Sequence, residues 1–333
     1  MSPSVSVVMP MYNAADTVAA AIASVRAQTF ADWELIVVDD GSTDASVAEA
    51  ARSAQGDPRI RIGAREHGGI VAALNVGCAD AQGRVLARMD ADDAMHPERL
   101  ERQRDLLQRD PRIGLCGARV RMVGEALGSG RRRYERWMNR LLTHEDMTRE
   151  ILIECPIAHP TFILPREAFE EAGGYVDAPW PEDYDLLLRV VRAGWRLAKT
   201  PETLLDWRHR ADRLSMNDSR YDEAAFRALK RRHLALTRPE AGRRVYQWGA
   251  GEVGKRWLRE WPEDQRPEAA VDINPRKIGR VIHGCPVIAA DELPPADEAF
   301  IIVAVGAPGA RDEIRAWLNP RGYQEARDYL FAA

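Results

Sequence analysis

The stretch Arg84-Val-Leu-Ala-Arg-Met-Asp-Ala-Asp-Asp93 constrains the fold most, because an apolar run there ends in three carboxylates within four residues. The run from Val85 to Met89 predicts a buried strand. Carboxylates crowded at the end of such a strand repel one another unless positive charge lies among them. A divalent cation with oxygen ligands would supply that charge, and open α/β sheets bind ligands at the carboxyl ends of strands. Alternatively, Asp92 and Asp93 only cap the helix that Pro97 opens.

Three further strand patterns precede this stretch and alternate with helical patterns. Val5–Met9 and Leu35–Val38 are apolar runs with the length of buried strands, and Arg59–Ile62 is expected to be a third strand. Between the third strand and Val85, apolar residues recur at helical spacing from Ile70 to Cys78, which predicts an amphipathic helix. Four strands that alternate with helices predict a mostly parallel sheet with helices on its faces, that is, an α/β fold.

Beyond the acidic cluster the pattern is less regular. Helices are expected at residues 97–108, 166–172 and 185–193, and strands within 113–123 and at 163–164. Residues Gly124–Arg140 are rich in glycine, arginine and aromatic side chains, without a clear period. They predict either a mobile loop over a binding site or an ordinary surface loop.

Bulk composition describes a globular protein of two domains. The chain has 333 residues, 45% hydrophobic and 29% charged, which is enough material for a sizeable core. Its formal net charge of -4 gives no indication of nucleic-acid binding. The four cysteines lack metal-ligand spacing and predict free thiols in a reducing compartment. Neither a signal peptide nor a membrane-spanning run is evident, so we expect a cytoplasmic protein, with peripheral membrane contact left open.

The sequence changes character after Tyr221, which predicts a second domain. We expect a first α/β domain at residues 1–220, a helix and linker at 221–243, and a small Rossmann-like domain at 244–333.

A glycine-rich loop opens this second domain. Gly249, Gly251 and Gly254 follow a predicted strand in a Gly-x-Gly-x-x-Gly pattern, and Asp272 lies about eighteen residues beyond the last glycine. That pattern matches the dinucleotide fingerprint, in which glycines let the backbone approach a pyrophosphate at a helix N-terminus. Only three clear strands are evident rather than six, so a complete NAD site is not expected. The loop predicts either a ligand site or a domain used for docking and homo-oligomerisation.

Several short motifs occur in a characteristic order along about the first 215 residues. They are Val7-Val8-Met9-Pro10-Met11-Tyr12-Asn13, Asp39-Asp40-Gly41-Ser42-Thr43-Asp44, Asn75-x-Gly77, Asp90-Ala91-Asp92-Asp93, His159-Pro160-Thr161, Gly173-Gly174-Tyr175, Glu182-Asp183-Tyr184-Asp185-Leu186 and Trp207-Arg208-His209. In order and spacing, this set resembles the family 2 glycosyltransferases, which are inverting enzymes with the GT-A fold. The Arg65–Gly69 segment departs from the family pattern and leaves the donor contacts there open.

The resemblance implies a nucleotide-sugar donor, most simply a UDP-sugar. By similarity, Pro10 and Tyr12 line the nucleoside pocket, and Asp40 accepts a hydrogen bond from the base. Asp39 supports the same turn. The alternative for this acidic segment is a turn with a helix cap and no ligand.

The resemblance also implies Mn²⁺ or Mg²⁺ as cofactor. Asp92 is expected to ligate the metal, which takes up the charge of the departing diphosphate. Asp90 contacts the ribose or joins the metal shell, and Asp93 either joins them or only caps the helix. Arg208 and His209 are expected to contact the diphosphate, unless they form only a solvated basic loop.

Direct inversion requires a base that deprotonates the acceptor hydroxyl. The resemblance implies Asp183 for this role, with the adjacent Glu182 as the second choice and His159 in support. Two acids at the start of a helix are also stabilised by the helix dipole whatever their role.

The expected activity is transfer of one sugar to a glycan or lipid-linked acceptor during surface polysaccharide synthesis. The Gln-x-x-Arg-Trp motif of processive relatives is absent, which favours addition of a single sugar. A sugar-1-phosphate nucleotidyltransferase would instead need a glycine-rich basic loop where Pro10-Met-Tyr-Asn13 stands. A regulatory sugar-nucleotide-binding protein would not need the base. An NAD-dependent sugar oxidoreductase would need the second domain to bind the cofactor.

Overall fold

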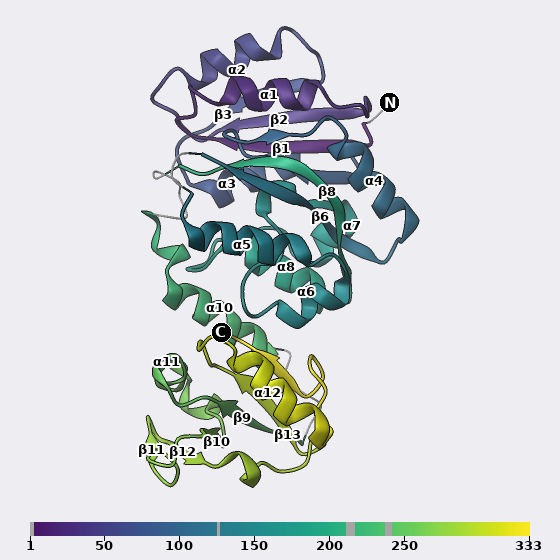
Figure 1. The fold of residues 1–333 in the computed structure, drawn as a ribbon. Coiled ribbons are helices and arrows are strands. Elements are labelled where there is room, and N and C mark those ends of the chain that lie inside the picture. Colours follow the sequence, from purple (N-terminus) through teal and green to yellow (C-terminus); the bar gives the residue numbers. More distant parts are fainter. Residues whose placement is uncertain (1–2, 125–126, 211–216, 237–241) are drawn as a thin grey trace. The chain divides into compact units, whose positions relative to one another are not determined.

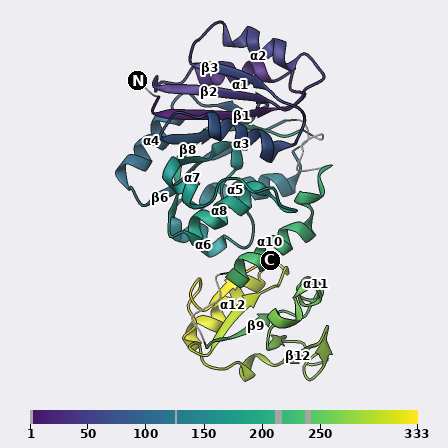
Figure 2. The ribbon, with the colours of Figure 1, turned by 180° about the vertical axis from the view of Figure 1, so that it is seen from behind.

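The computed structural model describes residues 3–124, 127–210, 217–236 and 242–333 (Figures 1 and 2). The chain divides into two compact units. Unit 1 comprises Met1–His144 and Pro156–Asp222, and unit 2 comprises Glu145–Cys155 and Glu223–Ala333. Each unit has its own sheet and its own hydrophobic core.

Unit 1 contains a mixed eight-stranded sheet in the order β3-β2-β1-β4-β7-β6-β8-β5. The strands are β1 (Val5–Met11), β2 (Trp33–Asp39), β3 (Ile60–Ala64), β4 (Val85–Arg88), β5 (Ala94–Met95), β6 (Ile113–Val123), β7 (Ile163–Pro165) and β8 (Arg196–Arg208). Strand β1 pairs in parallel with β2 and β4, and β2 pairs in parallel with β3, which confirms the predicted parallel half. Strand β7 then runs antiparallel to both β4 and β6. Residues 113–123 form one long strand and not the several predicted.

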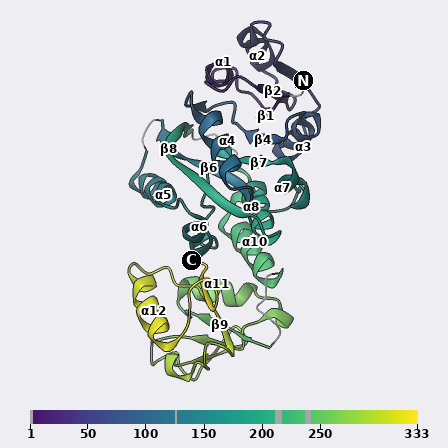
Figure 3. The same cartoon turned by 90° about the vertical axis from the view of Figure 1, so that its right-hand side faces the viewer.

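Helices cover both faces of the parallel half because β1 is apolar on both faces. Among the described residues of this part of the chain, the helices are α1 (Val18–Arg26), α2 (Ser46–Ala54), α3 (Ile70–Asp80), α4 (Arg99–Arg109), α5 (Ser129–Arg140), α6 (His144–Glu150), α7 (Arg166–Glu171) and α8 (Glu182–Arg192), with 3-10 turns at His159–Thr161 and Ser219–Tyr221. All of α6 except His144 belongs to unit 2. Val7 and Met9 share a core with Ile22 of α1. On the other face, a Cβ at Gly77 of α3 would overlap Val8. Figure 3 shows α1 and α3 on opposite sides of β1.

The arginine-rich segment after β6 forms helix α5 (Ser129–Arg140), so the predicted loop is wrong for these residues. Only Met138 is fully buried on this helix, with Tyr134 and Trp137 partly buried beside it. Because arginines occupy much of the remaining surface, a search for apolar spacing does not detect the helix. Residues 125–126 of the segment lie outside the described part of the chain.

Unit 2 contains a six-stranded sheet in the order β11-β12-β10-β9-β13-β14. The strands are β9 (Arg244–Trp248), β10 (Ala269–Val271), β11 (Val281–Ile282), β12 (Cys285–Ile288), β13 (Ala299–Val303) and β14 (Tyr329–Phe331), and the helices are α10 (Glu223–Leu236), α11 (Glu252–Glu260) and α12 (Ala310–Leu318). Strand β9 pairs in parallel with β10 and β13, which gives a small Rossmann-like domain. The prediction of only three strands is wrong, because β11, β12 and β14 are two to four residues long and too short to stand out by pattern. Residues 237–241 of the predicted linker lie outside the described residues.

Unit 2 also includes residues 145–155, which precede the 3-10 turn at His159 in the sequence. The ammonium group of Lys230 on α10 donates to the carbonyl oxygens of Ile153 at 2.8 Å and Ala332 at 3.3 Å. Burial lowers the pKa of Lys230 to about 8. Two parts of the chain that are far apart in sequence therefore share one core.

Candidate active site

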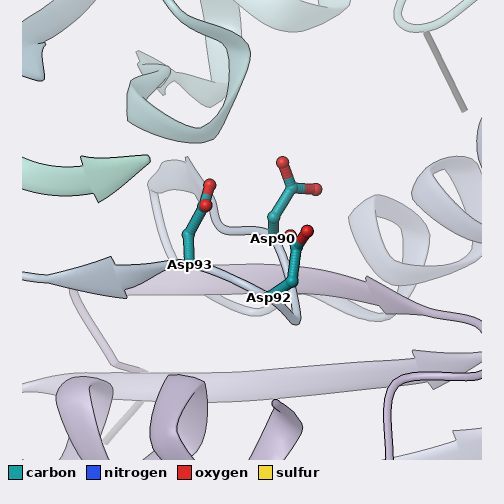
Figure 4. Close-up of side chains that lie close together, drawn as sticks. All are labelled: Asp90, Asp92 and Asp93. Carbon is teal, nitrogen blue, oxygen red and sulfur yellow. The ribbon is translucent and has the colours of Figure 1, made fainter. Parts of the chain in front are cut away.

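The carboxylates of the acidic stretch stand together in a loop directly after β4 (Figure 4). One oxygen from each of Asp90, Asp92 and Asp93 lies within 4.8 Å of the others. Asp93 is buried, whereas Asp90 and Asp92 are half-buried, and the three side chains point to the same side of the loop. Carboxylate oxygens are hard ligands that suit Mg²⁺ or Mn²⁺. These residues therefore fit a divalent cation.

Two buried arginines support the acidic loop. Arg88 forms an ion pair with Asp90, and Arg99 donates to the Arg88 carbonyl oxygen at 2.8 Å and to Gln103 at 2.9 Å. Burial opposes the charge on Arg88, but Asp90 holds the pKa of its guanidinium above the ordinary value. Burial lowers the pKa of Arg99 to about 9. These side chains supply part of the positive charge expected among the carboxylates, so crowding alone does not require a metal.

Arg208, the last residue of β8, is joined to the acidic loop. Its backbone N–H donates to Asp93 Oδ1 at 2.7 Å, and its Nε donates to the Asp92 carbonyl oxygen at 3.0 Å. Helix α4 begins without a side-chain cap, so the alternative in which the acidic loop caps that helix is wrong. His209 Nδ1 lies 3.0 Å from Arg131 Nη1 of α5.

Asp40 follows β2 and is held by the loop after β3. Its carboxylate accepts the backbone N–H groups of Gly68 at 3.1 Å and Gly69 at 2.8 Å. Arg65 forms an ion pair with it, and His67 Nδ1 lies 2.9 Å from its Oδ2. The side chain of Asp40 is only 4% exposed. The loop that departs from the family pattern thus encloses the residue expected to contact the base.

The neighbouring positions form the rest of this sheet edge. Asp39 is buried and accepts the Ser42 N–H at 3.2 Å through Oδ2, while its Oδ1 meets no donor among the described residues. Pro10 lies within β1, and Tyr12 follows that strand. Tyr12 is 49% exposed, and its ring centroid lies 4.5 Å from that of His67. An exposed aromatic pair of this kind can stack with a planar base.

Helix α8 begins three residues earlier than predicted, which places Glu182 and Asp183 in its first turn. Glu182 is buried; its Oε2 accepts the hydroxyl of Tyr221 at 2.6 Å, and its Oε1 lies 3.5 Å from His159 Nδ1. Burial raises the pKa of Glu182. Asp183 is half-buried and is therefore the more accessible of the two acids.

His159 occupies the buried space behind Glu182. Its Nε2 lies 2.8 Å from the hydroxyl of Tyr175, and its ring packs edge-on against Phe162. Burial and the charge of Arg88 lower the pKa of His159 well below its ordinary value, so the ring is neutral. Arg88 also interacts electrostatically with Glu182. The Arg88 backbone N–H also donates to the Phe162 carbonyl oxygen at 2.8 Å, so the strand that leads to the acidic loop lies beside the turn that holds His159.

Sequence reasoning missed Arg88, Arg99 and Tyr221. Arg88 carried a visible signal, because it is the one charged residue inside the apolar run of Val85–Met89. Arg99 lies on a helix, where arginine is ordinarily exposed. Tyr221 is 39 residues from its partner Glu182 in the sequence, and no local pattern predicts that contact.

In unit 2, packing inside the domain accounts for two glycines of the glycine-rich loop. Gly249 has a φ of +113°, and a Cβ there would lie 2.6 Å from the Ala304 carbonyl oxygen. A Cβ at Gly254 would overlap the backbone of Gly249. Gly251 precedes α11, and a Cβ there would meet nothing within 4 Å.

Asp272 directly follows β10 and contacts the same loop. Its Oδ2 accepts the Ala250 N–H at 3.0 Å and the Lys277 ammonium at 2.9 Å, and its Oδ1 accepts the Asn274 N–H at 2.9 Å. In a dinucleotide site the corresponding acid binds a ribose hydroxyl. Here three protein donors already use most of the acceptor capacity of its two oxygens.

Comparison with known proteins identifies the family of the first unit. Residues 6–173, half of the chain, match the family model described as Glycosyl transferase family 2. An uncharacterized glycosyltransferase of Haemophilus influenzae is 30% identical over 239 residues, which cover 70% of this chain and 73% of that protein. The amylovoran biosynthesis glycosyltransferase AmsE of Erwinia amylovora is 30% identical over 210 residues, covering 62% of this chain and 77% of that protein.

Solved structures share the fold at lower identity. S. aureus TarS in complex with UDP-GlcNAc aligns with a TM-score of 0.56 and 18% identity, over 71% of this chain and 66% of that chain. The mannosyltransferase PcManGT of Pyrobaculum calidifontis, in complex with GDP-Man and Mn²⁺, aligns with a TM-score of 0.51 and 20% identity, over 70% of this chain and 62% of that chain. These likenesses confirm the predicted GT-A fold of the first sheet and its helices. Within the described part of the chain, no helix combines the length and apolar character needed to cross a bilayer.

Proposed function

Because the chain belongs to glycosyl transferase family 2, we propose that it transfers one sugar, with inversion, from a nucleoside-diphosphate-sugar to a hydroxyl of a glycan or lipid-linked acceptor. UDP is the nucleotide we propose first. TarS was solved with a UDP-sugar and PcManGT with a GDP-sugar, so a test has to include both nucleotides.

One observation carries this proposal. Arg88 pairs with Asp90 of the acidic loop, and its backbone N–H donates to the Phe162 carbonyl oxygen at 2.8 Å. The ring of Phe162 packs against His159, which lies 3.5 Å from Glu182, the neighbour of Asp183. Carboxylates suited to a cation and an accessible acid suited to proton transfer therefore belong to one polar cluster of unit 1. Sugar transfer by direct displacement needs both functions, one for the leaving diphosphate and one for the attacking hydroxyl.

On the donor side, we propose that Tyr12 and Pro10 line the nucleoside pocket and that Asp40 accepts a hydrogen bond from the base. The loop after β3 holds the Asp40 carboxylate in one place, and a base would have to replace one of its present donors, of which the exposed His67 is the most accessible. Asp90 and Asp92 would hold Mn²⁺ or Mg²⁺, which when bound neutralises charge on the departing diphosphate. We propose that Arg208, already joined to that loop, contacts the diphosphate.

On the acceptor side, we propose that Asp183 removes the proton of the attacking hydroxyl. Its half-buried position supports this role, whereas the burial of Glu182 and its hydrogen bond to Tyr221 argue against Glu182 as the base. Glu182 and the neutral His159 would instead hold the first turn of α8 in place.

The setting we propose is surface polysaccharide synthesis; the Erwinia amylovora relative is named for amylovoran biosynthesis. We take residues 1–220 as the catalytic domain and 244–333 as a domain for docking or homo-oligomerisation. The engagement of Asp272 by Ala250 and Lys277 argues against a ribose contact at this residue and so against NAD binding.

The proposal is tested by calorimetric titration of UDP, GDP, CDP and dTDP into the full chain, with and without Mn²⁺. We expect one nucleotide to bind tightly and only in the presence of the metal. If no nucleotide binds, or if binding ignores the metal, the acidic loop does not form a donor site and the proposal fails.

A further inference from the structure

Helix α5 presents a row of arginines that takes no part in the proposed chemistry. Arg132, Arg133, Arg136 and Arg140 are all exposed. At about 100° per residue, their positions fall within one sector of roughly 100° on the helix surface. No ion pair joins any of the four to another described residue. We call this sector the arginine face.

Contacts outside the arginine face fasten α5 to unit 1. The Asn139 carbonyl oxygen accepts Arg119 Nε at 2.8 Å, and the Asn139 side chain bonds to both backbone groups of Val120, at 2.7 and 3.0 Å. The buried ammonium of Lys199 donates to the Met138 carbonyl oxygen at 2.6 Å. The arginine face is therefore not required to hold the helix in place.

The same helix contacts the strand end that lies at the candidate site. The ring centroid of Tyr134 lies 6.5 Å from that of Trp207, and Arg131 Nη1 lies 3.0 Å from His209 Nδ1. Trp207 and His209 flank Arg208, which bonds to the acidic loop. Figures 1 and 3 show α5 beside the carboxyl end of β8. Whatever binds the arginine face would thus lie near the proposed site.

The form of the arginine face indicates what it binds. Its arginines extend over about 12 Å along a convex helix surface, which suits several phosphates spread over a plane better than one small anion. Trp137 borders the face but packs against the core of unit 1, so the attraction to an anionic membrane comes from the arginines, as it does for other clusters of basic residues. The formal net charge of the chain is -4, so this positive charge is local. We propose that the arginine face docks the protein on an anionic phospholipid surface.

Docking of this kind would present a lipid-linked acceptor to the site. This consequence rests on the proposed transferase function, whereas the docking itself does not. A failure of one is therefore distinguishable from a failure of the other.

The test is co-sedimentation of the full chain with vesicles. We expect binding to vesicles of phosphatidylcholine mixed with phosphatidylglycerol, and little binding to phosphatidylcholine alone. One basic residue near an anionic surface contributes about fivefold to membrane partitioning. The variant R132Q/R133Q/R136Q/R140Q is thus expected to bind several hundredfold more weakly, on the order of fivefold for each arginine. Its thermal unfolding should match that of the unsubstituted chain, because the four side chains are exposed.

A control variant separates the arginine face from the effect of net charge. R84Q/R259Q/R276Q/R280Q removes four other exposed arginines and should keep full vesicle binding. The proposal would be overturned if both variants lost vesicle binding equally. It would also be overturned if the α5 variant bound vesicles as well as the unsubstituted chain. Binding of inorganic pyrophosphate in solution would be measured for the same variants. If the α5 substitutions abolished pyrophosphate binding but left vesicle binding unchanged, the arginine face would bind a soluble phosphate group and the proposal would fail.

Discussion

Replacing Tyr221 with phenylalanine tests the polar cluster beside the proposed base. The Tyr221 hydroxyl donates to Glu182 Oε2 at 2.6 Å, and Glu182 is 2% exposed, so little water is available to replace that hydrogen bond. A hydrogen bond to a charged group contributes about 1.5–3 kcal/mol to stability. We expect Tyr221→Phe to lower the free energy of unfolding of unit 1 by about that amount at pH values where Glu182 is ionised.

The size of this loss should depend on pH. Burial raises the pKa of Glu182 above its ordinary 4.5, and the Tyr221 hydroxyl partly opposes that rise. A carboxyl with a raised folded-state pKa contributes its full stability below pH 4.5, and this contribution is lost as the pH rises through the folded-state pKa. Without the hydroxyl that pKa rises further. The destabilisation of Tyr221→Phe relative to the unsubstituted protein is therefore largest above the folded-state pKa of Glu182, and it becomes smaller as the pH falls toward 4.5.

Ser6→Ala is the matched control, because Ser6 Oγ also donates to a buried carboxylate, Glu34 Oε1, at 2.6 Å. Burial alone would raise the pKa of Glu34, but hydrogen bonds from Ser6 and Gln82 and the charge of Arg61 hold it below its ordinary value. Urea unfolding followed by circular dichroism measures the free energy of unfolding at about pH 8 and about pH 5. The loss of that free energy in Tyr221→Phe should be smaller at about pH 5 than at about pH 8, whereas the loss in Ser6→Ala should be the same at both. A loss for Tyr221→Phe that is equal at both pH values would refute the reasoning.

Other perturbations address the proposed site and the free thiols. Asp183→Asn should keep nucleotide affinity in calorimetry but lower sugar-nucleotide turnover at least about a hundredfold, and unchanged turnover would remove Asp183 as the base. Asp92→Ala should abolish the Mn²⁺ dependence of nucleotide binding, and a retained dependence would move the ligand to another carboxylate of the loop. Burial raises the pKa of Cys78 and of Cys116 to about 12 and that of Cys285 to about 11. These thiols should not react with a disulfide reagent at about pH 8 before the protein unfolds, and rapid labelling would show that they are accessible.

The parallel half of unit 1 and its acidic loop were predictable because their signals are local. Buried strands such as Leu35–Val38 are continuous apolar runs, and the carboxyl ends of parallel strands meet at one sheet edge. That rule brings the turn after β2 and the acidic loop after β4 to the same edge without any knowledge of side-chain contacts. The order of motifs then added the family and its GT-A fold.

The remaining features depend on contacts between distant residues. Lys230 bonds to the Ile153 carbonyl oxygen across 77 positions, so no local pattern predicts that residues 145–155 belong to unit 2. Helix α5 is held in part by backbone carbonyl groups that accept from Arg119 and Lys199, and such contacts leave no apolar period in the sequence. The same limit applies to Tyr221, whose importance appears only when the fold brings it to Glu182.

The configuration of the released sugar tests the central claim most directly. The protein would be incubated with Mn²⁺ and α-linked sugars of the nucleoside diphosphate that titration identifies, with water as acceptor. Proton NMR would record the sugar before its anomers equilibrate. A single displacement assisted by Asp183 predicts that the β-anomer appears first and that Asp183→Asn releases it at least about a hundredfold more slowly. Initial release of the α-anomer, or an undiminished rate in the variant, would contradict the proposed mechanism.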